Sequence, residues 1–268
     1  MMGAAIMEAL VKKIGLPAGD ICVGEPTADR RAFLASTLGV RTVEDNLSAV
    51  SEADIVVLAV KPQMLPGAAA QLQGKIPPNA FVLSIMAGVP TADIQTRLGL
   101  KAVVRTMPNT PAQIGEAMTV WTASQEVAES QRAQAAAVLQ GMGRELYVQK
   151  EEALDMATAI CGSGPAYTYL LMEAQVDAAV HMGLPRADAI PLVIQTVLGT
   201  AKLAMQSDKH LAELRNMVTS PGGTTAEAIY QLEKGGMRTV LSKAIWAAYQ
   251  KSCLLGRRAA ASQKKSDD

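Results

Sequence analysis

Short, uninterrupted runs of apolar and mostly branched residues constrain the fold of this chain more than any other feature. A strand with one solvent-facing side alternates apolar and polar residues, whereas a strand buried on both faces is apolar throughout. Such runs lie at 21–23, 55–60, 81–85 and 102–105. Segments with helical spacing separate or follow them, at 28–38, 66–72, 91–98 and 126–142. The pattern predicts an open α/β domain whose parallel sheet is covered by helices, of the kind that binds nucleotides.

The residues that follow these runs are the first candidates for a binding site. Ligands of open α/β sheets lie across the carboxyl ends of the strands. Small residues and prolines let a ligand approach the backbone there, although each of these loops could also be ordinary turn chemistry. The segments are 24–27 with Arg30 and Arg31, then Lys61 and Pro62, then 86–89, and finally 106–111. Their occurrence after successive strands favours a common cleft.

The first of these strand ends carries the signals for cofactor choice. A carboxylate at the end of the second strand of such a domain binds a ribose diol and favours NAD, whereas an arginine nearby accommodates the 2′-phosphate of NADP. Glu25 favours NADH, and Thr27, Arg30 and Arg31 favour NADPH. These residues alone leave the choice open.

The second half of the chain contains only helical patterns. They span 153–159, 165–182, 186–206, 211–218, 225–234 and 237–257. Residues 169–172 and 190–194 are apolar almost all round the helix, so these helices need to be buried. Few helices in a thin domain leave apolar surface exposed unless the chain dimerises. We expect a dinucleotide-binding domain at 1–150, an all-helical substrate and dimerisation domain at 151–268, and an obligate dimer.

Composition narrows the class of partner. Lys plus Arg number 25 and Asp plus Glu number 25, so no net field recruits nucleic acid or an anionic membrane. The longest apolar runs are strand-sized rather than membrane-sized. The three cysteines, Cys22, Cys161 and Cys253, have no metal-like spacing, and their odd number without a signal peptide favours a reducing cytoplasm. We expect a cytoplasmic protein with a small-molecule partner and no metal site.

The segment 220–225, Ser-Pro-Gly-Gly-Thr-Thr, places hydroxyls and flexible backbone at the start of a helix. The first N–H groups of a helix have no intrahelical partner and carry the positive end of the peptide dipoles. A carboxylate or phosphate can therefore bind there without a cationic side chain. An ordinary N-cap with a Pro-Gly turn is the alternative that the segment alone leaves open.

Together with three further motifs, this segment carries a resemblance to one family. The motifs are Ala-Val-Lys-Pro at 59–62, Arg-Thr-Met-Pro-Asn-Thr-Pro at 105–111 and Gly-Ser-Gly-Pro-Ala-Tyr at 162–167. In this order and spacing they resemble the pyrroline-5-carboxylate reductases over essentially the whole chain. The resemblance implies a Rossmann-like domain followed by an all-α dimerisation domain, and reduction of 1-pyrroline-5-carboxylate to L-proline with NADPH preferred over NADH. It also implies a homodimer that can assemble into a ring of dimers.

The resemblance implies roles for individual residues. The substrate carboxylate would lie on the helix start at Ser220, Gly223, Thr224 and Thr225, with the Thr225 hydroxyl near the ring nitrogen as the catalytic contact. Glu152 and Asp208 match acidic positions near the substrate more loosely, and each could equally be a solvated surface carboxylate. The positions that match the cofactor cleft are Asn46, Ala59, Val60, Lys61, Pro62, Ala87 and Gly88, in addition to Glu25, Thr27 and Arg30.

The start of the sequence departs from this resemblance. A dinucleotide domain of this kind opens with a strand and a glycine-rich turn, which lets the backbone approach the pyrophosphate. Residues 1–6, Met-Met-Gly-Ala-Ala-Ile, resemble the family just past that turn, inside the first helix. We expect the first strand and most of the glycine-rich turn to be absent, through a misassigned start codon or a real truncation.

Two other interpretations remain at this stage. A β-hydroxyacid dehydrogenase-like NADP enzyme shares the same domain plan and would need a catalytic lysine in the helical domain, for which Lys202 is nearest by position. A catalytically inactive truncated dimer would retain the helical domain and lack a competent phosphate loop.

Overall fold

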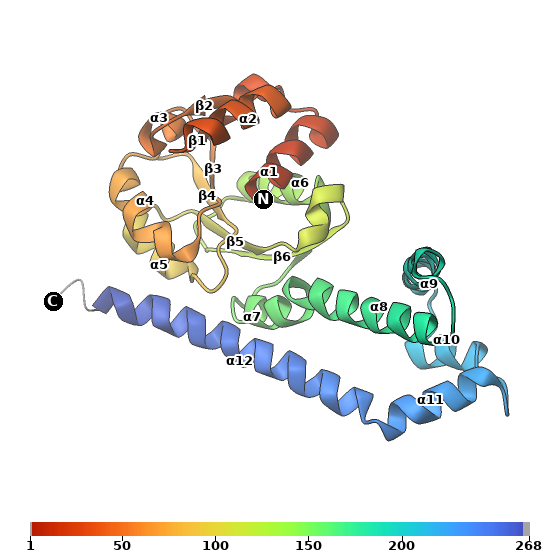
Figure 1. Ribbon diagram of the computed structural model, residues 1–268. Helices are drawn as coiled ribbons and strands as arrows, with labels where there is room; N and C mark the ends of the chain where they lie inside the picture. Colours follow the sequence, from red (N-terminus) through yellow and green to blue (C-terminus); the bar gives the residue numbers. More distant parts are fainter. Residues whose placement is uncertain (1, 265–268) are drawn as a thin grey trace. The chain divides into compact units, whose positions relative to one another are not determined.

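The α/β part of the chain has the predicted alternation of strands and helices (Figure 1). The computed structural model describes the backbone of residues 2–264. The helices of this part are α1 (Met2–Ala9), α2 (Ala28–Leu38), α3 (Asn46–Val50), α4 (Leu65–Leu72), α5 (Thr91–Leu98), α6 (Glu129–Gln140) and α7 (Ala153–Ala157). The strands are β1 (Cys22–Gly24), β2 (Arg41–Val43), β3 (Ile55–Leu58), β4 (Phe81–Ser84), β5 (Val103–Met107), β6 (Ala117–Ala123) and β7 (Gly143–Tyr147).

The larger sheet has the order β3-β4-β5-β6-β7. Its first three strands are parallel, in the register Ile55 opposite Phe81 and Val82 opposite Val103. They are the continuous apolar runs of the sequence, so the predicted buried parallel sheet is confirmed. β6 and β7 were not predicted, and β6 is antiparallel to β5, which makes the sheet mixed.

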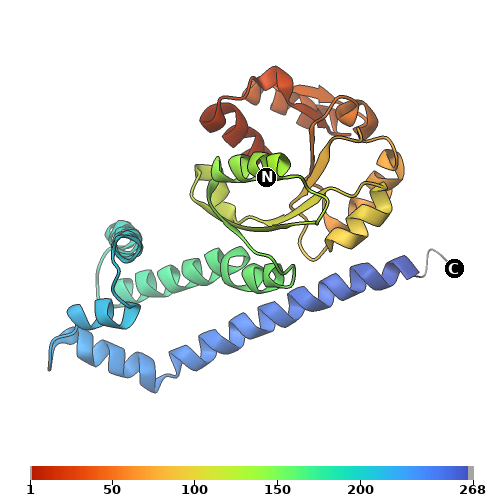
Figure 2. The same cartoon turned by 180° about the vertical axis from the view of Figure 1, so that it is seen from behind.

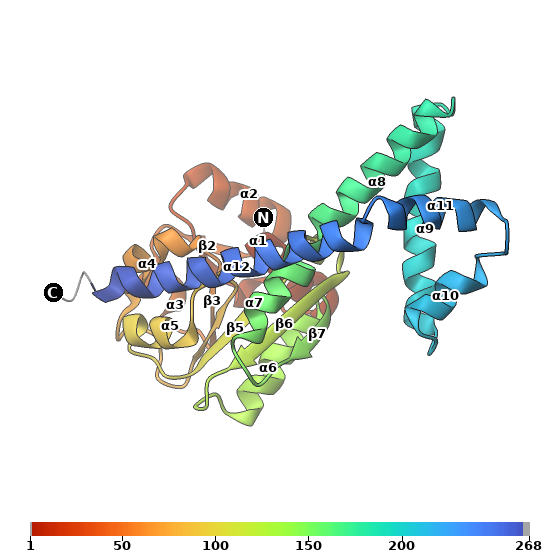
Figure 3. The same ribbon diagram turned by 90° about the horizontal axis from the view of Figure 1, so that it is seen from below.

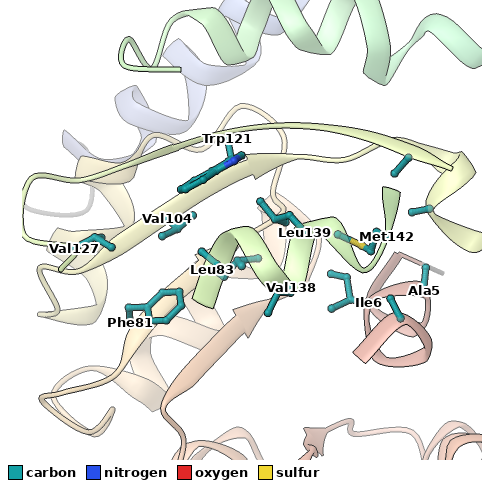
Figure 4. Packing of buried hydrophobic residues seen from close by; sticks show 14 residues of the cluster. Ala5, Ile6, Phe81, Leu83, Val104, Trp121, Val127, Val138, Leu139 and Met142 are labelled. Carbon is teal, nitrogen blue, oxygen red and sulfur yellow. The ribbon is translucent and has the colours of Figure 1, made fainter. Parts of the chain in front are cut away.

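Helices cover both faces of this sheet, as the apolar strands require. α1 and α6 lie on one face (Figures 1 and 2), where Ile6 and Leu139 pack with Phe81, Leu83 and Val104 in one buried cluster (Figure 4). On the other face, α3, α4 and α5 pack against β3, β4 and β5. Phe81, Val82 and Leu83 of β4 are 0% exposed, and each of these side chains contributes about 1.5–3 kcal/mol by burial. The carboxyl ends of β3, β4 and β5 are therefore held by the core.

The sheet is interrupted between β1 and β3. β1 and β2 form a separate two-stranded parallel sheet, and in the part of the chain that the structure describes no ladder joins it to β3. The first described element is α1, with no strand or glycine-rich turn before it among the described residues. Its first turn lies at the carboxyl end of β3, since a methyl group at Gly3 would lie 3.2 Å from the Ala59 side chain.

The helical part of the chain consists of α8 (Gly164–His181), α9 (Arg186–Gln206), α10 (Leu211–Met217), α11 (Thr224–Lys234) and α12 (Met237–Lys264). Their bounds match the predicted helices within a few residues, except that α12 is longer. α8 and α9 contact each other and diverge from the turn that joins them (Figure 3). Many apolar residues of these helices are exposed, among them Tyr169, Leu192 and Val240. The prediction that these helices leave apolar surface exposed within a single chain is therefore confirmed.

α9 is apolar enough on average to stand out, although it contains no long uninterrupted apolar run. By length and composition alone it could cross a membrane, and 6% of its most apolar window is buried within the chain. Its apolar residues are interrupted by Gln195, Thr196 and Thr200, so no single run of them is membrane-sized. A partner helix would cover the same surface.

Packing divides the chain into two compact units. The first is Met1–Ser163 with the chain from Ala248 onward, and the second is Gly164–Ala247. The division falls 13 residues after the domain boundary expected at 150, because α7 and the following π-helical turn η5 (Thr158–Gly162) pack on the α/β core. The C-terminal half of α12 likewise belongs to the first unit. The boundary at 150 stays a prediction.

Candidate functional site

The predicted anion site lies at the start of α11 in the second unit. The helix begins at Thr224, and Gly223 is its N-cap with an extended backbone and no side-chain cap. Gly222 adopts φ +68°, a left-handed conformation that favours glycine. A Cβ at Gly223 would collide with the hydroxyl oxygen of Ser220, so that hydroxyl lies against the first turn. The sequence correctly placed the helix start at the glycines.

The first turn of α11 offers several donors to one ligand. The N–H groups of Thr224, Thr225 and Ala226 are the first of the helix and have no acceptor within it. The Thr224 side chain is exposed, and that of Thr225 is half-buried. Uncapped N–H groups, the positive end of the helix dipole and hydroxyls on one turn suit a carboxylate.

The two acidic candidates lie in different units. Asp208 is exposed in the bend between α9 and α10, in the same unit as α11. Glu152 is the N-cap residue of α7 in the first unit, and its side chain caps nothing. Neither carboxylate has a hydrogen bond or ion pair within the part of the chain that the structure describes. Both therefore stay predictions.

The cofactor candidates of the first unit gather after the parallel strands. After β1, the Glu25 carboxylate accepts a hydrogen bond of 3.0 Å from the Thr27 backbone N–H and so closes its own loop. Arg31 donates from Nη1 to the carbonyl oxygens of Glu25 and Pro26, each at 2.8 Å, and Nη2 lies 3.7 Å from the Glu44 carboxylate. The Arg31 guanidinium is therefore part of the loop rather than available to a ligand.

Arg30 differs from its neighbour. Its guanidinium lies 5.1 Å from the ring centroid of Phe33 and has no hydrogen bond or ion pair to any described residue. The charge is thus not neutralised within the described chain. An uncompensated guanidinium beside the β1 end fits a dinucleotide with a 2′-phosphate, whereas the sequence could not separate Arg30 from Arg31.

Asn46 is placed by the start of α3. The Asp45 carboxylate caps this helix by accepting hydrogen bonds from the Ser48 N–H at 2.7 Å and from the Ser48 hydroxyl at 2.8 Å. These two hydrogen bonds lower the pKa of Asp45. The Asn46 amide donates to Gln71 at 2.9 Å, and its side-chain oxygen lies so close to Gly24 that a Cβ there would be 2.7 Å away. Glycine at the end of β1 therefore lets Asn46 reach the strand end.

The ends of β3 and β4 present small residues. Ala59 and Lys61 are exposed, and Val60 and Pro62 are half-buried. After β4, Ala87 is exposed whereas Gly88 is buried. Short side chains at adjacent parallel strand ends leave space for a flat ring near the backbone, so these residues fit a nicotinamide dinucleotide.

The loop after β5 has a structural role that its motif does not reveal. Asn109 accepts a hydrogen bond from the Met118 N–H at 3.0 Å and donates to the Cys161 carbonyl oxygen at 3.1 Å. Thr106 donates to the Ser84 carbonyl oxygen at 3.1 Å. These groups connect β4, β6 and η5, so we assign them to the framework of the site.

A buried ionic network was missed by the sequence analysis. Arg105, 5% exposed, lies 2.9 Å from the Glu151 carboxylate and 3.7 Å from that of Asp155. Glu151 also accepts from the N–H and hydroxyl of Thr91, each at 2.8 Å, and Asp155 accepts from the Ser252 hydroxyl at 2.7 Å. These partners are far apart in sequence, and only the fold brings them together.

The candidate of the alternative dehydrogenase interpretation has no comparable setting. Lys202 is exposed on α9, without a hydrogen bond or ion pair to any residue that the structure describes. A catalytic lysine is normally desolvated or paired with an acid. The geometry therefore gives Lys202 no support as a catalytic group.

Comparisons with known proteins agree over both parts of the chain. Residues 151–255 match a family model described as pyrroline-5-carboxylate reductase dimerisation, and residues 1–88 match one described as NADP oxidoreductase, coenzyme F420-dependent. A pyrroline-5-carboxylate reductase of Synechocystis is 41% identical over 258 residues, covering 96% of each chain.

Solved structures give the same result. A pyrroline-5-carboxylate reductase of Coxiella burnetii is 36% identical, with a TM-score of 0.88 over 95% of this chain and 94% of that chain. A Plasmodium falciparum pyrroline carboxylate reductase with NADP bound is 28% identical, with a TM-score of 0.86 over 95% of this chain and 94% of that chain.

Proposed function

Because the chain belongs to the pyrroline-5-carboxylate reductase family, we propose that it reduces 1-pyrroline-5-carboxylate to L-proline with NAD(P)H, NADPH being the preferred donor. The observation that carries the proposal is the uncapped start of α11, which suits the single carboxylate of a small cyclic imine. The β-hydroxyacid dehydrogenase-like interpretation loses its support with the exposed Lys202.

The substrate site that we propose consists of Ser220, Gly223, Thr224 and Thr225. The backbone N–H groups of the first turn and the hydroxyls of Ser220 and Thr224 hold the carboxylate. The hydroxyl of the half-buried Thr225 faces the substrate ring and forms a hydrogen bond with the ring nitrogen. Glu152 and Asp208 are retained as outer acidic positions near the substrate.

The reaction asks for placement more than for acid–base groups. A reduced nicotinamide supplies a hydride when bound. The imine nitrogen already carries a proton, so addition of the hydride to the adjacent carbon converts the C=N double bond into the secondary amine of proline. The Thr225 hydroxyl holds the nitrogen, and the α11 N–H groups hold the carboxylate; together they fix the ring for in-line transfer.

The cofactor site that we propose runs across the ends of β1, β3 and β4. Arg30 pairs with the 2′-phosphate, and Glu25 and Thr27 shape the ribose pocket. The rest of the cleft consists of Asn46, Ala59, Val60, Lys61, Pro62, Ala87 and Gly88. Ala59 and Ala87, both exposed, leave room beside the strand ends.

The assembly that we propose is a homodimer through residues 151–268, able to form a ring of dimers. The exposed apolar residues of α8 and α9 support a second copy as the partner. We propose a cytoplasmic location, because the expected substrate and cofactor are soluble metabolites.

The decisive experiment measures NADPH oxidation by the purified chain with 1-pyrroline-5-carboxylate. Thr225→Val should lower kcat/KM for the imine about tenfold or more, because a hydrogen bond to a charged group is lost. Thr225→Ser keeps the hydroxyl and should retain most of the activity. Equal activity of Thr225→Val and the parent chain would refute the substrate site.

A binding titration separates a working enzyme from an inactive dimer. NADPH binding tighter than roughly 0.1 mM, about 5.5 kcal/mol, is expected for a competent cleft. Failure to bind at millimolar NADPH would instead favour the inactive dimer.

A further inference from the structure

The C-terminal part of α12 touches the loop that follows β4. Gly256 of the helix and Gly88 of the loop approach backbone to backbone: a methyl group at residue 256 would lie 3.2 Å from the Gly88 carbonyl oxygen. A methyl group at residue 88 would in turn lie 3.3 Å from the Gly256 nitrogen. Both segments belong to the first compact unit. A side chain on either residue would therefore fit only if the neighbouring backbone moved by a few tenths of an ångström.

A second contact fixes the same face of α12 one turn earlier. Ser252 is four residues before Gly256, so the two lie on one side of the helix. Ser252 is 5% exposed, and its hydroxyl donates to the Asp155 carboxylate, which lies beside the buried Arg105. The neighbouring Leu255 is 47% exposed, and its Cβ would lie 3.5 Å from a methyl group at residue 88. The buried face of α12 is therefore held by a polar anchor at Ser252 and a glycine contact at Gly256.

The loop under this contact is the one that borders the proposed nicotinamide cleft. Gly88 adopts φ +72° and is buried, whereas Ala87 is exposed next to it. On its strand side the loop is held by the Met86 N–H, which donates to the Ser84 hydroxyl at 3.2 Å. The loop that contains Gly88 thus contacts α12 on one side and β4 on the other. The position of Ala87 depends on both contacts.

We propose that Gly256 is a positioning residue for the cofactor: by letting α12 reach the Gly88 backbone, it sets the loop 86–89 against which NADPH binds. This inference rests on the proposed cofactor cleft. A side chain at residue 256 pushes the loop by a few tenths of an ångström and narrows the cleft. Ser252 keeps the helix in place and is a positioning residue of the same kind.

The test compares Gly256→Ala, Ser252→Ala and the parent chain as full-length proteins. Kd and KM for NADPH, KM for the imine, kcat and the melting temperature are measured for each. Gly67→Ala is the matched control, because Gly67 lies in helix α4 of the same unit with nothing within 4 Å of an added methyl group.

Gly256→Ala should raise Kd and KM for NADPH about fivefold. This factor corresponds to the smallest free-energy cost that overpacking usually has. KM for the imine should not change. Ser252→Ala should change NADPH binding in the same direction by a smaller factor, and it keeps the test open if Gly256→Ala does not fold. Gly67→Ala should bind NADPH like the parent.

NADPH binding by both variants with the parental Kd would overturn the positioning role. So would parallel losses in both substrates that follow the melting temperature, since a merely structural role predicts them. A parent chain that itself fails to bind NADPH would overturn the proposed function instead, so the two failures are distinguishable.

Discussion

Arg30 gives the sharpest test of cofactor choice, because the neighbouring Arg31 is a natural control. Both follow β1, but Arg31 is bound to the carbonyl oxygens of its own loop, whereas Arg30 only stacks on Phe33. Replacing Arg30 by alanine removes a charge without breaking a hydrogen bond of the folded chain. We therefore expect Arg30→Ala to change cofactor binding while leaving the loop intact.

The expected effect of Arg30→Ala on KM for NADPH follows from the exposure of the Arg30 side chain. A hydrogen bond to a charged group contributes about 1.5–3 kcal/mol. Arg30 is half-buried, and screening by solvent places its contact with a 2′-phosphate at the lower end of that range. About 1.4 kcal/mol corresponds to a tenfold change. Arg30→Ala should therefore raise KM for NADPH roughly tenfold.

The assay is initial-rate kinetics with NADPH and with NADH at saturating imine. NADH lacks the 2′-phosphate, so Arg30→Ala should change its KM by less than about twofold. Arg31→Ala should weaken both cofactors alike, because it loosens the loop that Glu25 and Pro26 form. Equal effects of Arg30→Ala on NADPH and NADH would refute the assignment of Arg30 to the phosphate.

Two further predictions concern buried groups of the first unit. Arg105→Met leaves the carboxylates of Glu151 and Asp155 without their cation and should cost about 3–5 kcal/mol of unfolding free energy in urea titrations; a loss below about 1 kcal/mol, typical of a surface pair, would contradict this. Burial raises the pKa of the Cys161 thiol, so its alkylation by iodoacetamide should be slower than that of an unperturbed cysteine at pH 7.5, and the pH of its half-maximal rate should lie above about 8.5. Peptide-resolved mass spectrometry measures the rate, and a half-maximal rate at or below about pH 8.5 would exclude the raised pKa. Because the folded state holds this proton more tightly, the folding stability falls as pH rises from the unfolded-state pKa through the folded-state pKa.

The strands predicted from the sequence are those buried on both faces. β3 and the first residues of β4 and β5 are apolar because helices cover both sides of the sheet. β7, Gly-Arg-Glu-Leu-Tyr, is an edge strand whose residues are half-buried or exposed, so it lacks an apolar run. β6 buries Thr119 and Thr122 among its apolar residues, and those hydroxyls broke the pattern. Edge position and buried threonines depend on neighbours in space, which a single sequence does not reveal.

The same distinction applies to the site. The start of α11 was predictable because glycines and hydroxyl residues at a helix start are a local signal. The Arg105 network joins residues up to 97 positions apart and leaves no local trace. Gly256 is intermediate between these two cases. An isolated glycine inside a helical pattern indicates that another segment approaches the helix closely, but the pattern does not identify that segment.

The two ends of the proposed cofactor cleft rest on unequal parts of the fold. β3 and β4, at the nicotinamide end, belong to the buried sheet. Arg30 and Glu25 instead follow β1, whose only ladder among the described residues is a three-residue pairing with β2. A two-stranded sheet has little stability of its own, so this end depends on contacts such as Gly24 with Asn46 and the buried Leu34 of α2. Phosphate recognition can thus be altered without moving the strand ends at which we propose hydride transfer. For this reason we expect Arg30→Ala to change cofactor preference rather than the chemical step.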